Sequence, residues 1–327
     1  MKALVTGGTG FLGSHLVESL IEKKIQVRCL VRNPKKIKWL EGIDAEIISG
    51  DCSDRNSLTE AVKGVDYVFH IAGLVRGLTS DEVYKVNVKG TGNIVEAVAE
   101  QNPGIKKFVY VSSQAATGPS KDNKPLDESA APNPVSHYGF SKLLGELEVQ
   151  KYAKTIPVTI LRPPSIYGPR DKDIFVFFEY VKKGYFPMPE DKRFINITYV
   201  TDIAEGVVSA GLSDNTAGKT YFLGDDTIYS WEDLAKILIN TVNPKAKVKK
   251  LPKAAFFLSA IIEELKAKTS KNPAVVSFDK LKELGQKYWL FSTVSAKNDF
   301  GYSPKIPLEK GIGITYQWYL KKGWLKK

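Results

Sequence analysis

Apolar positions in the first half of the chain follow two alternating patterns. Short, nearly continuous apolar runs predict buried strands, and longer segments with apolar residues three or four positions apart predict helices. The runs that predict strands are residues 3–5, 26–31, 45–49, 66–73, 107–112 and 158–162. The helical patterns between them cover residues 11–21, 81–101 and 137–153. This alternation predicts an α/β fold, a doubly wound parallel sheet with ligands at the carboxyl ends of its strands.

The alternation becomes irregular after residue 165. Helical patterns cover residues 174–183, 201–212, 231–241, 254–265, 274–284 and 308–320, and residues 220–223 predict one late strand. We therefore expect a dinucleotide-binding Rossmann domain from residues 1–165 together with about 195–225. Residues 166–194 and 226–327 are expected to form a smaller, mostly helical substrate-binding domain over the carboxyl edge of the sheet. A stretch rich in Pro, Asn, Asp and Ser at residues 121–134 predicts a surface loop.

A glycine-rich turn joins the first predicted strand to the first predicted helix. Its sequence is Thr6-Gly7-Gly8-Thr9-Gly10-Phe11-Leu12-Gly13. Glycine lets backbone N–H groups approach a dinucleotide pyrophosphate, and a helix N-terminus favours negative charge. Gly13 is expected to let the helix pack closely on the strand. Although such loops also occur as plain turns, the flanking strand and helix favour a cofactor site. The residues assigned to it are Gly7, Thr9, Gly10, Phe11, Leu12 and Gly13.

The ends of the second and third predicted strands bear on the choice of cofactor. After the second strand an acidic residue accepts hydrogen bonds from the ribose 2′-hydroxyl of NAD, whereas an arginine accommodates the 2′-phosphate of NADP. The chain has Arg32 there, with Lys35 nearby. This favours NADP, with NAD possible, unless both residues merely cap a surface loop. After the third strand, Asp51 and Cys52 are assigned to the cofactor site; Asp51 could reach the adenine edge or cap the helix near residue 54.

The fourth predicted strand ends in small residues. Ala72 and Gly73 allow the backbone to pass close under a cofactor, and both are assigned to the cofactor site. His70 lies inside the preceding apolar run. This position favours a core histidine over a catalytic one.

Tyr138 and Lys142 lie four residues apart in a predicted helix. Their side chains share one face, with Cβ atoms about 5–6 Å apart. Because a nearby cation stabilises a phenolate, Lys142 is expected to lower the pKa of Tyr138 from about 10 toward neutrality. Such a tyrosine can exchange a proton with an alcohol or ketone during hydride transfer. Of the 15 tyrosines, only Tyr138 has a lysine four positions later. Ser113, after the fifth strand, could bond the same substrate oxygen or simply close the strand.

With these motifs, the chain resembles the extended short-chain dehydrogenase/reductase superfamily over nearly its whole length. The glycine turn matches the family's phosphate loop, and Ser113, Tyr138 and Lys142 match its catalytic serine, tyrosine and lysine. Further stretches typical of the family are residues 68–73, 87–91, 161–169, 199–204, 300–304 and 323–325. The resemblance implies that Tyr138 and Lys142 also contact the cofactor, with Lys142 on the nicotinamide ribose, and that Pro163 and Ile166 line its site. It also implies a homodimer formed by the helices at residues 81–101 and 137–153.

Finer resemblances favour one branch of this superfamily. The stretch Val27-Arg28-x-x-Val31-Arg32-Asn33-Pro34 is similar to dihydroflavonol reductase-like enzymes, and residues 162–171 resemble the 3β-hydroxysteroid dehydrogenase branch. Sugar-nucleotide epimerases usually carry an asparagine where this chain has Ser165. Gln114 and Ala115 replace the acidic pair that 4,6-dehydratases need for eliminating water. We therefore expect an NADP(H)-dependent oxidoreductase that interconverts a secondary alcohol and a ketone. The alternatives are a nucleotide-sugar 4-epimerase with tightly bound NAD and a non-catalytic NADP-sensing regulator.

The 327 residues carry a net charge of +11, which is concentrated in the C-terminal quarter. Residues 245–327 hold 18 lysines and six acidic residues, whereas the first 244 residues balance to −1. Such a segment could attract an anionic substrate, an acidic membrane surface or nucleic acid. A solvated lysine-rich face is favoured, and no nucleic acid partner is expected because the segment contains no arginine and no known binding motif.

Two further observations concern membrane insertion and cellular location. The strongest apolar stretch, residues 254–262, is far shorter than the roughly 20 residues of a membrane span. Its apolar residues could line a pocket for a hydrophobic alcohol or ketone, or pack in the core. The two cysteines, Cys29 and Cys52, suit neither a disulfide scaffold nor a metal site. We expect no integral membrane segment, no metal and a cytoplasmic location, with a small-molecule alcohol or ketone as substrate.

Overall fold

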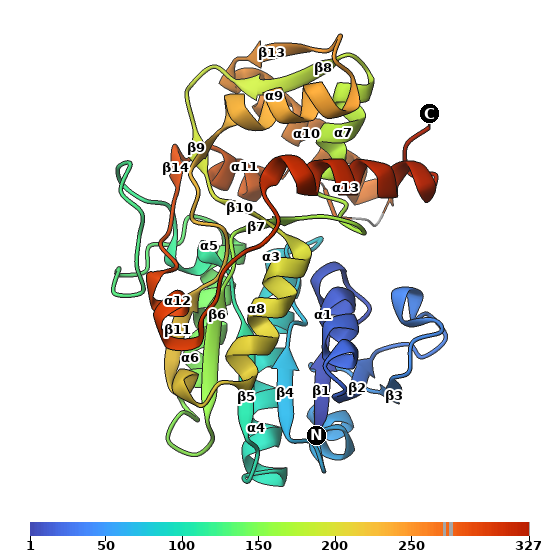
Figure 1. Cartoon of the computed structure of the whole chain (residues 1–327), viewed down its shortest axis with the longest axis vertical. Helices are drawn as coiled ribbons and strands as arrows, with labels where there is room; N and C mark the ends of the chain where they lie inside the picture. The colour runs from blue at the N-terminus through green and yellow to red at the C-terminus, as the bar shows by residue number, and fades with distance from the viewer. Residues whose placement is uncertain (271–272, 275–276, 327) are drawn as a thin grey trace.

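The computed structural model describes residues 1–270, 273–274 and 277–326 (Figure 1). Its main sheet has seven parallel strands in the order β11-β6-β5-β4-β1-β2-β3. The strands are β1 Lys2–Thr6, β2 Gln26–Val31, β3 Glu46–Ser49, β4 Tyr67–His70, β5 Lys107–Val111, β6 Val158–Arg162 and β11 Lys219–Phe222. The strand order reverses between β1 and β4, which is where a doubly wound sheet opens a ligand crevice at its carboxyl edge.

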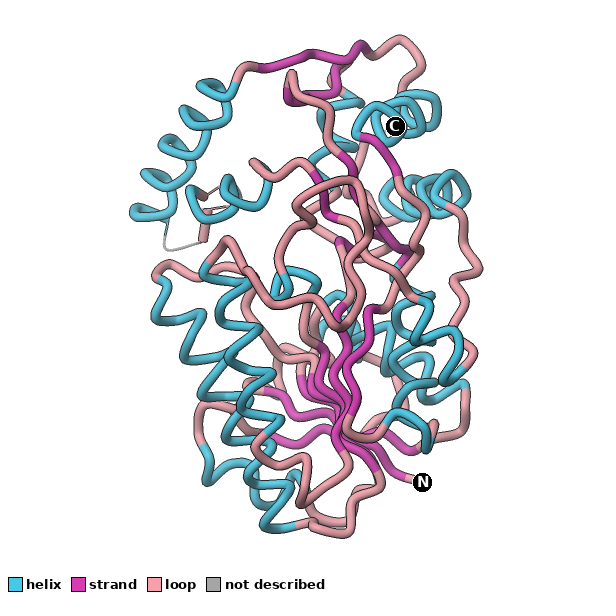
Figure 2. The backbone as a smooth tube through the Cα atoms, turned by 90° about the vertical axis from the view of Figure 1, so that its left-hand side faces the viewer, coloured by secondary structure: helices cyan, strands magenta, loops and turns pink. Residues whose placement is uncertain are grey.

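Helices cover both faces of this sheet, as the edge-on view in Figure 2 shows. On one face α1 (Phe11–Glu22) packs against α8 (Val200–Leu212). The other face carries α2 (Thr59–Val62), α4 (Thr91–Gln101) and α6 (His137–Gln150). Each face has its own fully buried apolar core, because strands buried on both sides alternate their side chains between two helical layers. The doubly wound α/β fold predicted from the sequence is therefore confirmed.

The C-terminal part lies over the carboxyl ends of the sheet strands (Figure 1). A third apolar core joins α7 (Phe175–Lys182), α9 (Trp231–Val242) and α13 (Leu308–Lys321). Short strands pair around these helices. They are β7 Ser165–Tyr167 with β10 Ile197–Tyr199, β8 Tyr185–Pro189 with β13 Lys247–Leu251, and β9 Phe194–Ile195 with β12 Tyr229–Ser230 and β14 Tyr288–Trp289. Two further helices, α10 (Lys253–Ser270) and α11 (Phe278–Leu284), form one side of this region.

Differences from the predicted elements are concentrated in this C-terminal part. The short strands β7 to β10 and β12 to β14 were not predicted. Most of them have only two or three residues, and the five-residue strands β8 and β13 contain prolines or lysines instead of a continuous apolar run. Helix α12 (Val294–Phe300), which was also missed, packs beside β11. The helix predicted at 274–284 begins at Phe278, and residues 275–276 of that prediction lie outside the described residues. The domain boundaries remain a prediction.

One predicted helix has an unexpected interior. The pattern at 81–101 forms α3 (Ser80–Tyr84), a π-helical stretch at Lys85–Gly90 and then α4. The insertion lies beside α6. Segments of this kind are frequent at functional sites.

Candidate active site

The glycine turn after β1 has the geometry that a pyrophosphate requires. Gly7 has a φ of +78°, and a Cβ there would lie 2.7 Å from the backbone nitrogen of Ala72. A Cβ on Gly13 would lie 2.1 Å from the Gly7 carbonyl oxygen, so glycine allows α1 to begin against the turn. Gly10 caps α1 without a side-chain hydrogen bond, and the first turn of the helix contains no acidic residue. The turn therefore offers free backbone N–H groups and a positive helix end to an anion.

The predicted residues around this turn lie at the same edge of the sheet. Thr9 and Phe11 are half-buried and Leu12 is buried at the start of α1. Ala72 and Gly73 directly follow β4, the neighbour of β1. Lys142 reaches the same place, because its Nζ would lie 3.7 Å from a Cβ on Gly73. The glycine turn and Lys142 thus face the same small-residue segment.

The residues predicted for the adenosine side follow β2 and β3. Arg32 and Lys35 are exposed, and Lys35 belongs to a turn in which its N–H donates to the Asn33 side chain over 3.0 Å. Burial and the charge of Asp51 raise the pKa of Cys52 to about 12, and the positive charge of Arg32 opposes this. The charge of Arg32 therefore acts on Cys52, which follows β3.

Asp51 does not cap the helix near residue 54. Its Oδ1 accepts a hydrogen bond from the Ser53 N–H over 2.8 Å, and the N-cap of the next short helix is Asp54. Asp54 therefore fills the capping role that was the alternative for Asp51, and the contact of Asp51 with the cofactor remains a prediction.

Tyr138 stands in the first turn of α6, beside Ser113. Ser136 caps this helix, with its Oγ accepting from the Gly139 N–H over 2.9 Å. A Cβ on Gly139 would lie 2.4 Å from the Ala115 carbonyl oxygen, so glycine lets α6 approach the segment that carries Ser113. The Ser113 hydroxyl is a hydrogen-bond partner of the Tyr138 phenol. The two side chains therefore lie next to each other, and their contact with a common substrate oxygen remains a prediction.

The pKa of Tyr138 is shifted opposite to the sequence-based expectation. Although the residue as a whole is half-buried, burial of its phenol group raises the pKa to about 12, and only the bond to Ser113 opposes the shift. The expectation rested on the charge of Lys142, but Lys142 is itself buried, and this lowers its own pKa to about 7. Desolvation disfavours the charged form of both groups, so the phenol is neutral at physiological pH.

Lys142 is held by the end of β5. Its Nζ donates to the Val111 carbonyl oxygen over 2.8 Å and lies 4.2 Å from the centre of the Tyr110 ring. These contacts leave further ammonium protons free for a ligand. The Lys142 side chain therefore extends from α6 to the end of β5 and lies close to Gly73.

A buried ion pair supports the segment that carries Ser113. Arg162, at the end of β6, donates to Glu146 of α6 over 2.9 and 2.6 Å, and the Ser112 hydroxyl donates to the same carboxylate over 2.5 Å. Ser113 itself caps the short helix α5 (Gln114–Thr117), accepting from the Ala115 N–H over 3.1 Å. Sequence reasoning missed Glu146, although it lies one helical turn beyond Lys142.

Asn87, in the π-helical stretch, connects the loop after β4 to α6. Its side chain exchanges hydrogen bonds with the backbone of Leu74, over 2.7 and 2.9 Å, and donates to the Ser141 hydroxyl over 2.9 Å. Ser141 in turn donates to the Tyr138 carbonyl oxygen over 2.7 Å. The loop after β4 is thereby fixed relative to α6.

His70 is a core histidine, as predicted. It is fully buried, with Nδ1 2.7 Å from Thr6 Oγ1 and Nε2 3.0 Å from Thr91 Oγ1. Burial, with a smaller contribution from Lys142, lowers its pKa to about 3. Both ring nitrogens are occupied by neighbours, so the ring has no free position for a ligand.

Pro163 directly follows β6 and Ile166 lies in β7, and their contact with the cofactor remains a prediction. The Pro163 carbonyl oxygen accepts from the Gln114 N–H over 2.8 Å, and Ile166 packs against the core that includes α1. The segment after β6 therefore lies at the carboxyl edge of the sheet, between α5 and α1.

Two acidic residues from the C-terminal part contact the start of α6, and neither was predicted from the sequence. Asp279 of α11 accepts from the N–H groups of His137 and Tyr138 over 2.9 and 3.4 Å. Glu283 accepts from the Ser136 hydroxyl over 2.6 Å. Because these partners are more than 140 residues apart, no local spacing could have revealed them. Negative charge is favourable at this helix end.

Neither a membrane-spanning helix nor a metal site is found among the residues that the structure describes. No helix there combines the length and apolar character needed to cross a bilayer. The same ranges contain no group of His, Cys, Asp and Glu side chains arranged to hold a metal ion.

Known proteins resemble this chain over most of its length. Residues 3–224 match the model of the NAD dependent epimerase/dehydratase family. Ceramide reductase of Caulobacter vibrioides is 27% identical, with 99% of this chain and 96% of the relative covered. Sterol-4-alpha-carboxylate 3-dehydrogenase, decarboxylating, of Mus musculus is 28% identical over 97% of this chain and 90% of the relative. The crystal structure of gox2253 has a TM-score of 0.80 and 28% identity, with 99% of both chains covered.

The family model, the relatives and the similar crystal structure all cover most of this chain. The chain therefore belongs to the NAD dependent epimerase/dehydratase family, within the extended short-chain dehydrogenase/reductase superfamily, and is an NAD(P)-dependent oxidoreductase.

Proposed function

We propose that this protein is an NADP(H)-dependent oxidoreductase that interconverts a secondary alcohol and a ketone on an apolar, lipid-like molecule. The observation that carries the proposal is the meeting of Ser113, Tyr138 and Lys142 at the end of β5, beside the glycine turn after β1. The glycine turn would hold the pyrophosphate, Lys142 the nicotinamide ribose and Arg32 the 2′-phosphate. The bound cofactor supplies or accepts a hydride.

Tyr138 serves as the proton donor in the direction of reduction. Its phenol is neutral at physiological pH, because its pKa lies at about 12, so the proton is present when a ketone oxygen arrives. The Ser113 hydroxyl orients that oxygen, and the charge on Lys142 favours the phenolate that remains. Since the pKa of Lys142 is about 7, this charge is itself pH-dependent near neutrality.

The lipid-like substrate is supported by the comparisons. Ceramide reductase and the sterol dehydrogenase are named for lipid substrates, and both match nearly the whole chain.

The reaction is tested by following NADPH oxidation with a panel of ketones that differ in apolar chain length. We expect steady turnover that becomes more efficient as the apolar part grows. A nucleotide-sugar 4-epimerase would instead convert UDP-sugars with no net change in NADPH, and a regulator would bind NADPH without consuming it. Either result would refute the proposed reaction.

The preference for NADP is tested at the exposed end of β2. Arg32→Ala should raise the KM for NADPH by about 10-fold or more, because a charge-assisted phosphate contact is lost, and leave the KM for NADH nearly unchanged. Lys36→Ala, in the same exposed turn, is the matched control and should affect neither. Equal effects of Arg32→Ala on the two cofactors would contradict a 2′-phosphate contact.

We also propose a homodimer that buries the outer surface of α4 and α6. Phe140, Leu144 and Leu147 are exposed on α6, and a shallow groove lies between this helix and residues of α3 and α4. Sedimentation should give a dimer that Leu147→Glu dissociates.

The two cysteines are free and buried, which supports a reducing compartment such as the cytoplasm.

A further inference from the structure

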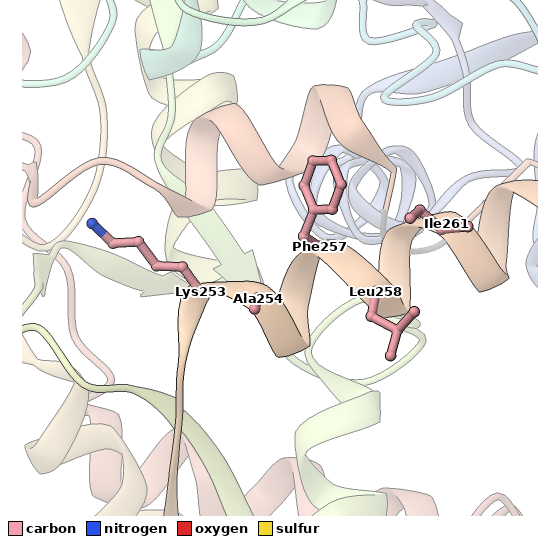
Figure 3. Close-up of a pocket in the computed structure, with 5 residues that line it drawn as sticks. All are labelled: Lys253, Ala254, Phe257, Leu258 and Ile261. Carbon is pink, nitrogen blue, oxygen red and sulfur yellow. The ribbon is translucent and has the colours of Figure 1, made fainter.

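Helix α10 turns its apolar face outward. Phe257, Leu258, Ile262 and Leu265 have exposed fractions of 55, 57, 44 and 58%, whereas Ala260 is fully buried. Figure 3 shows Phe257 and Ile261 on one side of this helix and Leu258 on another, with Lys253 extending from its start. Exposed apolar residues normally occur singly, and a contiguous group marks an interaction surface.

The apolar face is combined with a strong positive charge. Residues 245–270, which include all of α10, contain seven lysines and two acidic residues, Glu263 and Glu264. Lys247, Lys249 and Lys250 are exposed on β13, which leads directly into α10, and within the described part of the chain none of them forms an ion pair. Lys253, at the start of α10, lies 3.4 Å from Asp191 on the surface. Exposed lysines therefore stand immediately before the exposed apolar residues of α10 in the chain.

This surface is connected to the start of α6 through α11. The rings of Phe257 and Phe278 lie 4.9 Å apart, and the Phe278 N–H donates to Glu264 over 2.9 Å, which joins α10 to α11. The next residue of α11, Asp279, accepts hydrogen bonds from the first turn of α6. Figure 2 shows α10 at the outer edge of the C-terminal part, away from the sheet.

We propose that α10, with the lysines of β13, docks onto an anionic membrane surface. An amphipathic helix with apolar residues on one side and flanking lysines lies in the plane of the bilayer interface, and each lysine near anionic lipid strengthens binding. A second copy of this chain fits less well, because symmetric pairing of the face would bring the same lysines together. An acidic lipid surface matches both the apolar side chains and the charge.

The test is flotation of the full-length protein with phosphatidylcholine vesicles, with and without phosphatidylglycerol. We expect binding that requires phosphatidylglycerol and weakens as salt is added. Leu258→Glu combined with Leu265→Glu should reduce binding by more than about 10-fold, because two exposed leucines that the proposal buries in the bilayer are lost. Lys249→Gln combined with Lys250→Gln should reduce it by about 5-fold per lysine. Val294→Glu, at an α12 residue that is 56% exposed, is the matched control and should bind as the wild type does.

Three results would overturn the proposal. These are the absence of flotation with anionic vesicles, equal binding by the α10 variants and the wild type, and a change of oligomeric state in the leucine variant seen by sedimentation. The lysine variant keeps the test decisive if the leucine variant proves unstable, because exposed lysines are replaced without a change of packing. Thermal unfolding of each variant identifies any loss of fold.

Discussion

The carboxyl edge of the sheet and the α10–α11 pair meet at the start of α6, yet they differ in burial and in charge. At the sheet edge, polar groups are buried and paired, with Glu146 and Arg162 as the clearest case. On α10, apolar groups are exposed and the neighbouring lysines are solvated. In the proposed reaction the first arrangement holds the groups that transfer the proton, and in the proposed membrane docking the second provides the surface. The two proposals therefore concern separate parts of one chain.

The largest effect is expected at the sheet edge. Tyr138→Phe should lower kcat by about 10²–10⁴-fold, because a positioned proton donor is removed. NADPH affinity, measured by fluorescence titration, should change little, since the ring is retained. If kcat were unchanged, Tyr138 would not be the proton donor. The α10 variants provide the contrast, because their turnover of a water-soluble ketone should remain close to that of the wild type.

A second effect distinguishes the two regions by stability. Arg162→Met leaves the Glu146 carboxylate buried without its partner and should lower the free energy of unfolding by about 3–5 kcal/mol. The double variant with Glu146→Met should recover much of this loss, because no charge remains buried. Leu265→Glu on α10 should stay within about 0.5 kcal/mol of the wild type. Urea unfolding measures all three, and equal losses at the two sites would remove the distinction.

A third effect depends on pH. In the folded protein the pKa of Lys142 is about 7, below the 10.5 of an unperturbed lysine. Between these values the unfolded chain binds more protons than the folded chain, so this group makes stability rise with pH, by up to about 1.4 kcal/mol per pH unit. Lys142→Met should therefore gain most over the wild type below pH 7 and lose this advantage toward pH 10.5. A pH-independent difference in urea unfolding would contradict the shift.

The same contrast explains how much could be predicted from the sequence. The sheet, its covering helices and the spacing of Tyr138 and Lys142 are local patterns, and the structure contains them within a few residues. The direction of the Tyr138 pKa shift was wrong, because it depends on burial, which spacing does not report. The outward orientation of the apolar residues in α10 was equally hidden, since a core helix and a surface helix can carry the same apolar pattern.

The smallest effect concerns the junction between the two regions. Ser136→Ala removes the cap of α6 and its bond to Glu283, and should cost about 1 kcal/mol in the free energy of unfolding. Ser277→Ala removes the cap of α11, where Ser277 accepts from the Lys280 N–H over 3.1 Å, and should cost a similar amount. If the junction positions Tyr138, Ser136→Ala also lowers kcat with little change in the KM for NADPH, whereas Ser277→Ala leaves kcat intact. Equal kcat values for the two variants would show that α11 braces the helix without orienting the phenol.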